Sequence, residues 1–249
     1  MNRNQLFLST IAANGPQLAR RWQLGLEIAS FCTPQNLDEA FDQTDSQLRP
    51  QLEAITSRCF HGPFSELFPC AVDPKARELA AFRYRQAIDL AKRYHCTKVV
   101  LHGGFSPSSY YPQWYIAQSV DFWRTFLRQD PGITIVLENV LEGDSAWLPE
   151  ILAQVRHPRL KMCLDVGHVH AYSHQPISQW LEACSPYIDH IHLHDNDGTA
   201  DQHLELGQGT IPWDRVLDQI RQLCPHASLT LEVMEAEASL TWLHQRGWI

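Results

Sequence analysis

The sequence predicts an α/β protein with the architecture of a single (β/α)8 TIM barrel, and three observations support this prediction. Eight short runs of apolar and β-branched residues recur along the chain, which is the pattern of buried parallel strands. Most of these runs are separated by segments with helical periodicity. The length of 249 residues suits eight strand and helix units. A doubly wound open sheet would need a switch-point crevice and often a glycine fingerprint, and neither is visible.

The expected strands extend from the amino terminus almost to the carboxyl terminus. In chain order they are residues 5–10, 24–30, 57–62, 98–104, 134–140, 160–168, 188–195 and 229–234. The clearest connecting helix covers residues 74–95 and opens with Asp73 as its cap and Pro74 in its first turn. A second clear helix covers residues 212–224, whereas the one before Trp22 has a weaker pattern. No break in this pattern divides the chain, so we expect one domain over residues 1–249.

Composition favours a folded protein of a reducing compartment. Hydrophobic residues make up 44% of the chain, no segment approaches the roughly 18 apolar residues of a membrane helix, and the first ten residues contain too short an apolar stretch for a signal peptide. Seven cysteines include no CxxC pair, and Cys59 and Cys163 fall inside expected strands, so they are interpreted as small buried hydrophobes. We therefore expect a soluble cytoplasmic protein without a membrane partner.

The distribution of charge is more informative than its sum. Twenty basic and twenty-eight acidic residues give 20 − 28 = −8. In the loops that follow the expected strands, Lys75 is the only Lys or Arg, and none occurs between Met162 and Asp214. The barrel mouth should therefore be acidic and rich in histidine, which attracts cations and does not favour a nucleic-acid partner.

Nine potential metal ligands lie at or just beyond the ends of these expected strands. They are His61, His102, Glu138, Asp165, His168, His192, Asp201, His203 and Glu232. Because all strands of a barrel open on one face, these side chains are predicted to converge there. Imidazole and carboxylate groups suit zinc, manganese or magnesium.

Local patterns strengthen some of these assignments. Glu138 and Glu232 interrupt apolar strands, where a carboxylate is costly unless it is paired or metal-bound, and a structural ion pair is the alternative for either one. Asp165 ends a strand, and His168 follows after Gly167, a residue that lets the backbone turn. Both side chains could then face one centre.

Histidines of the segment 188–195 alternate with apolar residues. His190, His192 and His194 must point the same way from a strand, and we expect His192 to bind metal while the other two support it or line the pore. Asp201 and His203 flank one residue in a glycine-containing loop, a weak signal by spacing alone.

Two further histidines each precede a glycine. His61 and His102 follow strand-like runs, which is typical of places where backbone approaches a ligand, although a buried hydrogen-bonded histidine is the alternative for each.

The ordered set of ligands, from His61 to Glu232, resembles that of the xylose-isomerase-like TIM-barrel superfamily. That group includes sugar phosphate isomerases and epimerases, tagatose-type epimerases and endonuclease-IV-like AP endonucleases. The resemblance implies a core metal site of Glu138, Asp165, His192 and Glu232. It also implies, from the endonuclease branch, a metal shared by His61, His102 and Glu138 and another held by His168, Asp201 and His203. The resemblance thus allows for two or three ions.

Differences from that superfamily separate the functional hypotheses. The barrel mouth lacks the Arg and Lys residues that would grip a nucleic acid, and Gln208 stands where the usual LGEG turn has Glu. Our leading hypothesis is a metal-dependent isomerase or epimerase of a small sugar or related carbonyl compound, acting through a metal-stabilised enediolate. The alternative is an endonuclease-IV-like zinc phosphodiesterase. A noncatalytic metal- or sugar-binding barrel is the third hypothesis.

In the leading hypothesis each site residue has a role. Glu138 and Glu232 would transfer the proton as catalytic residues, and His168 with His61 or His102 would orient substrate hydroxyls. Trp114 and Trp213 would form walls of the substrate pocket. The oligomeric state and the identity of the sugar do not follow from the sequence.

Overall fold

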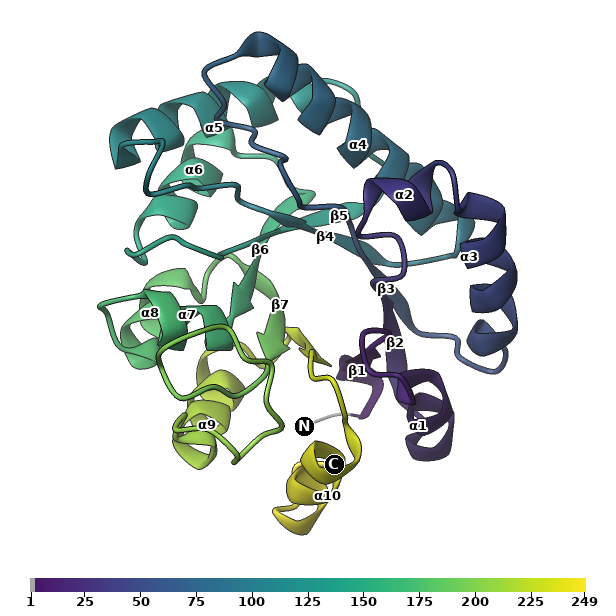
Figure 1. Ribbon diagram of the computed structural model, residues 1–249. Helices are drawn as coiled ribbons and strands as arrows, with labels where there is room; N and C mark the ends of the chain where they lie inside the picture. The colour runs from purple at the N-terminus through teal and green to yellow at the C-terminus, as the bar shows by residue number, and fades with distance from the viewer. Residues whose placement is uncertain (1–2) are drawn as a thin grey trace.

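Eight strands form a closed parallel barrel in this computed structural model, which describes residues 3–249 (Figure 1). The strands are β1 (Leu6–Ser9), β2 (Gly25–Ile28), β3 (Arg58–His61), β4 (Lys98–His102), β5 (Thr134–Glu138), β6 (Leu160–Asp165), β7 (Ile188–Leu193) and β8 (Ser228–Leu231). Each strand pairs with the next, and β1 pairs with β8 to close the ring. The predicted (β/α)8 barrel is confirmed, and every strand lies within its predicted range except that β8 begins one residue early.

Helices surround the barrel on its outer side (Figure 1). They are α1 (Gly15–Trp22), α2 (Pro34–Leu37), α3 (Phe41–Leu48), α4 (Pro74–Arg93), α5 (Pro112–Phe126), α6 (Trp147–Val155), α7 (Val166–Tyr172), α8 (Ile177–Cys184), α9 (Trp213–Leu223) and α10 (Glu237–Gln245), with short 3-10 turns at Arg3–Gln5 and Arg49–Leu52. Asp73 caps α4 as predicted, because its side chain accepts a hydrogen bond from the backbone N–H of Lys75 at 2.8 Å. Within residues 3–249, no helix combines the length and the apolar character that crossing a membrane requires.

Apolar burial is concentrated between the barrel and its helices rather than inside the barrel. Trp123 and Trp180 are fully buried in this outer layer, which forms the main hydrophobic core. A much smaller apolar group, Val100, Val136 and Cys163, is separate from it. Besides Phe7, Gly25 and Cys59, the other buried residues of the strands are polar or charged, among them Glu27, Glu138 and Asp165.

A register shift marks the pairing of β6 with β7. Met162 pairs with Ile188, but the next residue of β6, Cys163, pairs with His190, so Asp189 is an extra residue on β7. This bulge carries a charged contact, because both the backbone carbonyl and the carboxylate of Asp189 accept from Lys98 Nζ, at 2.8 and 2.5 Å. Beyond the bulge, Asp165 pairs with His192.

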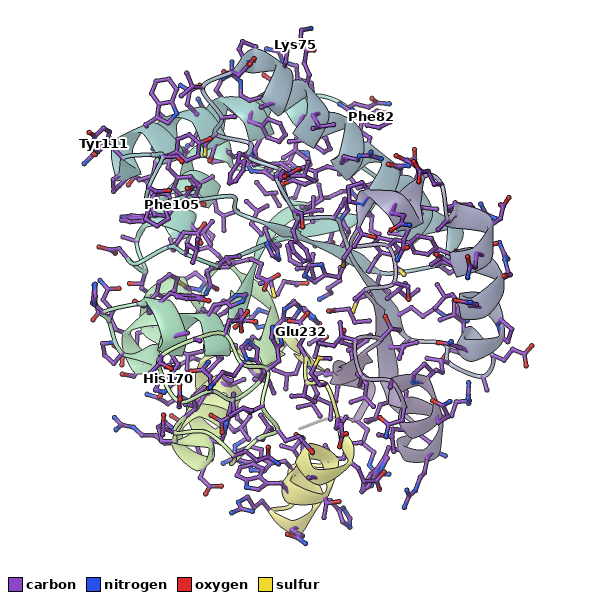
Figure 2. The ribbon with its side chains drawn as sticks, in the orientation of Figure 1. Lys75, Phe82, Phe105, Tyr111, His170 and Glu232 are labelled. Atoms are coloured by element: carbon purple, nitrogen blue, oxygen red, sulfur yellow. The ribbon has the colours of Figure 1, made fainter. Side chains whose placement is uncertain are left out.

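The carboxyl ends of the strands surround the centre of the molecule in Figure 2. Glu232, directly after β8, lies near the middle of the ring of strands, whereas Lys75 and Phe82 project outward from α4. The predicted ligand positions therefore belong to one end of the barrel.

Candidate metal centre

Six strands each bring one predicted ligand to the carboxyl end of the barrel. His61, His102, Glu138 and Asp165 are the last residues of β3, β4, β5 and β6, His192 is the last but one of β7, and Glu232 follows β8 directly. All are buried except His102, which is partly exposed. Parallel pairing sets their heights, since His102 is level with Glu138 and Asp165 with His192.

The four predicted core ligands meet around one ring nitrogen. His192 Nδ1 lies 3.0 Å from Glu232 Oε2, 3.3 Å from Glu138 Oε1 and 3.6 Å from Asp165 Oδ2. Asp165 Oδ2 is fully buried and has no hydrogen-bond partner. A buried carboxylate oxygen without a donor is costly. A divalent cation between these three carboxylates and the imidazole would satisfy it, so the donor set fits a metal.

A second group adjoins the first through Glu138. His61 Nε2 and His102 Nε2 lie 3.2 and 3.4 Å from Glu138 Oε2. Burial lowers the pKa of His102 to about 4, so its ring is held in the neutral form that binds metal. Phe64 stacks on the His102 ring with the ring centroids 4.5 Å apart. Glu138 thus contacts both groups, and the Phe64 ring lies beside His102.

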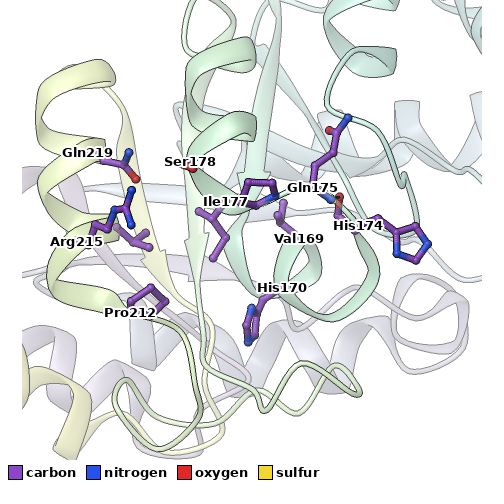
Figure 3. Close-up of a pocket in the computed structure, with 12 residues that line it drawn as sticks. Val169, His170, His174, Gln175, Ile177, Ser178, Pro212, Arg215 and Gln219 are labelled. Carbon is purple, nitrogen blue, oxygen red and sulfur yellow. Dashed lines mark hydrogen bonds between the residues drawn. The ribbon is translucent and has the colours of Figure 1, made fainter.

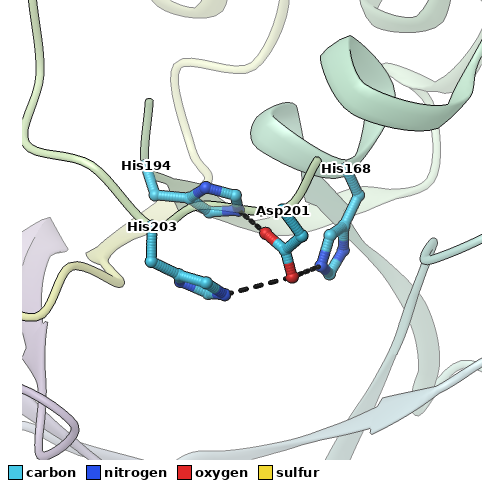
Figure 4. A group of neighbouring side chains, drawn as sticks. All are labelled: His168, His194, Asp201 and His203. Atoms are coloured by element: carbon cyan, nitrogen blue, oxygen red, sulfur yellow. Dashed lines mark hydrogen bonds and ion pairs between the residues drawn. The ribbon is translucent and has the colours of Figure 1, made fainter. Parts of the chain in front are cut away.

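A third group surrounds Asp201 (Figure 4). Its Oδ2 lies 3.2 Å from both His168 Nε2 and His203 Nε2, and its Oδ1 lies 3.5 Å from His194 Nε2. The His194 ring stacks on the His203 ring at 4.2 Å between centroids. Asp201 Oδ1 and His194 Nδ1 are buried without a hydrogen-bond partner. We name His168, His194, Asp201 and His203 the Asp201 group.

Asp165 is held in place by three local interactions. The amide of Asn139 pairs with the backbone of Asp165, donating to its carbonyl at 3.0 Å and accepting from its N–H at 2.9 Å. Asp165 Oδ1 caps α7 by accepting from His168 N at 2.6 Å, and His194 Nε2 lies 3.1 Å from the same oxygen. The cap explains why Asp165 and His168 face one centre, as the sequence predicted.

Gly167 is required by the packing of His194, which the sequence did not indicate. A β-carbon at position 167 would lie 1.9 Å from His194 Cε1, so only glycine lets the ring lie against this turn of α7. His194 was expected only to support the site or line the pore. It lies between Asp165 and Asp201 and links the core ligands to the Asp201 group.

The loop that carries Asp201 and His203 is tied to a single buried carboxylate. Asp195 accepts from the backbone N–H groups of Gly207 and Ile211 at 2.9 and 3.2 Å. His203 has a left-handed backbone with φ of 48°, and its Nδ1 lies 2.6 Å from the carbonyl oxygen of Glu232. A strained backbone at a ligand position is typical of functional sites. Gln208 is exposed at the edge of this loop.

Electrostatics in the centre is a balance between carboxylates and imidazoles. Burial alone would raise the pKa of Asp165, but His168, His194 and His192 hold it well below its usual range. Burial would likewise lower the pKa values of His168 and His203, but Asp165 and Asp201 raise the first to about 10, and Asp201 with Glu232 raises the second to about 9. Among the described residues, every ion pair of Glu138, Asp165, Asp201 and Glu232 is with a histidine. Within residues 3–249, the partners of these carboxylates are thus imidazoles, which can bind metal, rather than Lys or Arg.

Sequence reasoning did not identify Glu27 or Phe64. Glu27 lies in β2, is fully buried, and places Oε2 3.3 Å from His192 Nε2. The signal was the same as for Glu138 and Glu232, a glutamate inside an apolar strand, and it could have been found. Phe64 lies beyond the end of β3, where no periodicity indicates that a ring will cover His102.

The two predicted wall tryptophans lie apart from the ligand groups. Trp114, in α5, is 38% exposed and donates through Nε1 to the backbone carbonyl of Cys70 at 2.9 Å. Trp213 opens α9 and is only 2% exposed, which leaves almost no surface for a substrate. Neither has a hydrogen bond to a predicted ligand among the described residues.

A cavity in the outer layer lies outside the ligand groups (Figure 3). It has a volume of about 410 Å³ and is bordered by α7, α8 and α9, with His170 and Arg215 among its lining residues. None of the nine predicted ligands lines it. The ligand groups and not this cavity are the candidate site. Buried carboxylates and imidazoles that converge are costly unless they have a function, whereas a hollow on the surface has no such cost.

Comparison with known proteins agrees with this geometry. The family model described as xylose isomerase-like TIM barrel matches residues 19–248. The uncharacterized protein MJ1311 of Methanocaldococcus jannaschii is 27% identical over 224 residues, which are 85% of this chain and 73% of that protein.

Solved structures share the whole fold. The TTHB071 protein from Thermus thermophilus, soaked with ZnCl2, superposes with a TM-score of 0.79 and 25% identity, covering 97% of each chain. A D-tagatose 3-epimerase-like protein has a TM-score of 0.76 and 21% identity, covering 98% of this chain and 96% of that one. D-Psicose and D-allulose 3-epimerases are further structures of this fold, at identities that show the fold alone.

Proposed function

The chain belongs to the xylose isomerase-like TIM barrel family, and from this premise we propose that it is a metal-dependent isomerase or epimerase of a small sugar or related polyhydroxylated carbonyl compound. One observation carries the proposal. Glu138, Asp165 and Glu232 all approach His192 Nδ1, and two of these carboxylates are glutamates from well-separated strands. That arrangement supplies both a cation site and a pair of proton-transfer groups in one buried place.

The chemistry of the metal would be that of a Lewis acid, which stabilises negative charge on neighbouring oxygens of the substrate. Zinc and manganese both accept this mixture of nitrogen and oxygen donors. Glu138, Asp165, His192 and Glu232 would hold the core ion, with His61 and His102 sharing Glu138 and the Asp201 group holding a further ion.

The two glutamates divide the proton transfer between them. One carboxylate removes the proton from the carbon beside the substrate carbonyl, and the other returns a proton to the opposite face or to the neighbouring carbon. Burial alone would raise the pKa values of both glutamates, whereas His192 lowers them, so both carboxylates are held in the ionised form that a base requires. His61, His102 or His168 would orient substrate hydroxyls, and Phe64 would exclude water from one side.

A second candidate is an endonuclease-IV-like zinc phosphodiesterase, and the Asp201 group is the observation that favours it. This group offers donor atoms to an ion beyond those that an epimerase needs, and Asp201 Oδ1 is an orphaned buried oxygen within it. Phosphodiester hydrolysis by several zinc ions would use such an additional site. The sequence around the barrel mouth has few basic residues to grip a nucleic acid, so we place this function second.

Replacement of Glu232 tests the first proposal. Glu232→Gln keeps the shape of the side chain and removes the base, so exchange of the substrate proton with solvent deuterium should fall by at least the roughly 10²-fold typical of a lost general base. The exposed Glu235→Gln is the matched control and should exchange like the unchanged protein. The assay screens unphosphorylated ketoses, with abasic duplex in parallel.

Three outcomes separate the candidate functions. Sugar turnover that disappears in a Glu232→Gln protein that still binds zinc supports the proton-transfer role. Cleavage of the duplex with no sugar turnover would replace the isomerase by the phosphodiesterase. Unchanged deuterium exchange in a folded Glu232→Gln protein would refute the two-glutamate mechanism.

A further inference from the structure

A buried carboxylate below the candidate metal centre has no role in the proposed proton transfer. Glu27 of β2 is fully buried, and its Oε2 lies 3.3 Å from His192 Nε2, on the side of that ring away from Glu138 and Glu232. The same oxygen is approached by His190 Nε2 at 3.0 Å and by Thr230 Oγ1 at 2.9 Å. Its other oxygen has no hydrogen-bond partner. The hydrogen bonds described for this carboxylate are thus all made by Oε2.

Donors and acceptors around Glu27 form one directed chain. Lys98 Nζ can only donate, and it gives one hydrogen bond to Ser228 Oγ at 2.8 Å. Ser228 is then free to donate to His190 Nδ1 at 2.6 Å, which leaves the proton of His190 on Nε2, facing Glu27. The chain therefore begins at a cation at the start of β4 and ends at the carboxylate of Glu27.

The direction of this chain fixes the ring of His192. An ionised carboxylate accepts hydrogen bonds and does not donate them, so His192 must place its proton on Nε2. Its Nδ1 faces Glu138, Asp165 and Glu232, and a metal ion bound there would take the place of any proton on Nδ1 and leave the ring proton on Nε2. A carboxylate on the far nitrogen of a metal-binding histidine is a general means of orienting the ring and raising its basicity.

We propose that Glu27 is a positioning residue that keeps a proton on His192 Nε2 and so aims Nδ1 at the core ion, and that His190, Ser228 and Lys98 hold Glu27 in turn. The inference rests on the metal centre of the proposed function but not on its sugar chemistry. Within residues 3–249, Glu27 forms ion pairs with histidines and with no Lys or Arg, so its burial is costly. If it served packing alone, an apolar side chain would do so at lower cost.

Zinc affinity of Glu27→Gln tests the proposal by chelator competition on the metal-free protein. Loss of the charged acceptor should weaken zinc binding by about 10- to 100-fold, the range for such supporting groups. Glu142→Gln is the matched control, since Glu142 is also a buried glutamate, but its partners are Tyr115 Oη at 2.6 Å and the N–H of Val140 at 2.7 Å. It should keep zinc affinity within about twofold, whatever it loses in thermal stability.

A second measurement on the unchanged protein does not depend on whether the variant folds. Nitrogen-15 NMR of the zinc-loaded chain should show a protonated Nε2 and a zinc-bound Nδ1 for His192. Binding through Nε2, or equal zinc affinity of a folded Glu27→Gln protein, would overturn the role of Glu27 and leave the metal centre standing. A chain that binds no zinc would overturn both.

Discussion

Substitution of Gly167 by alanine should disrupt the metal centre through packing alone. The added β-carbon would lie 1.9, 2.3 and 2.4 Å from Cε1, Nε2 and Nδ1 of His194. That ring is fully buried and cannot retreat easily, because His203 stacks on it. Either α7 or the imidazole must move, and His194 Nε2 then leaves its position 3.1 Å from Asp165 Oδ1.

The magnitude follows from the cost of overpacking a filled interior. Such insertions typically cost about 1 to 3 kcal/mol. For a chain of this size each kcal/mol lowers the melting temperature by about 2 to 4 °C, so the decrease should be about 2 to 12 °C. Differential scanning calorimetry of metal-free protein measures it, and zinc titration should show weaker binding as well.

Gly143→Ala provides the matched control. A β-carbon at position 143 meets no atom within 4 Å, and its φ is not in the left-handed region. This variant should melt at or slightly above the temperature of the unchanged protein, because alanine restricts the unfolded chain. If Gly167→Ala melted and bound zinc like Gly143→Ala, the inferred packing of His194 against α7 would be wrong.

Two further predictions concern protons and the support of Asp165. Because the pKa values of His168 and His203 are raised to about 10 and about 9, their contribution to stability is complete below the unfolded value near 6.5 and is lost as pH rises through 9 to 10. Metal-free protein should therefore lose thermal stability between about pH 6.5 and 10, and a melting temperature that does not change with pH would contradict this. Zinc binding at neutral pH should release protons, which calorimetry in two buffers measures. Asn139→Ala leaves the buried N–H and carbonyl of Asp165 without their amide partner, which should cost about 1 to 3 kcal/mol of stability for each group. Denaturant unfolding measures the loss, and an unchanged free energy of unfolding would show that these two hydrogen bonds are unimportant.

Much of the fold and of the ligand set follows from local patterns in the sequence. Parallel strands that are buried on both sides appear as continuous apolar runs, so their ends, and the ligands at those ends, could be placed without coordinates. Glu138 and Glu232 stood out because a charge inside an apolar run needs a partner. Glu27 interrupts the apolar run of β2 in the same way, so the sequence also contained the signal for this residue.

Other features depend on contacts between distant segments. The packing of His194 on Gly167 joins β7 to α7, and no spacing rule connects residues 27 apart in this way. Trp213 is apolar enough for a pocket wall or for a core, and only its burial shows that it packs inside. The end of α4 at Arg93, two residues short of the expected boundary, reflects His95, which adopts a left-handed φ of 57°.

The bulge at Asp189 decides which side chains occupy the bore of the barrel. If the two strands paired without this shift and Asp189 were kept, the pairing of Met162 with Ile188 would continue as Cys163 with Asp189 and Asp165 with Ile191. Ile191 and Leu193 would then turn inward and the imidazoles would face the helices, because a slip of one residue exchanges the two faces of a strand. The bulge thus places the imidazoles of β7 in the bore, and deletion of Asp189 itself would keep them there, because Cys163 would still pair with His190.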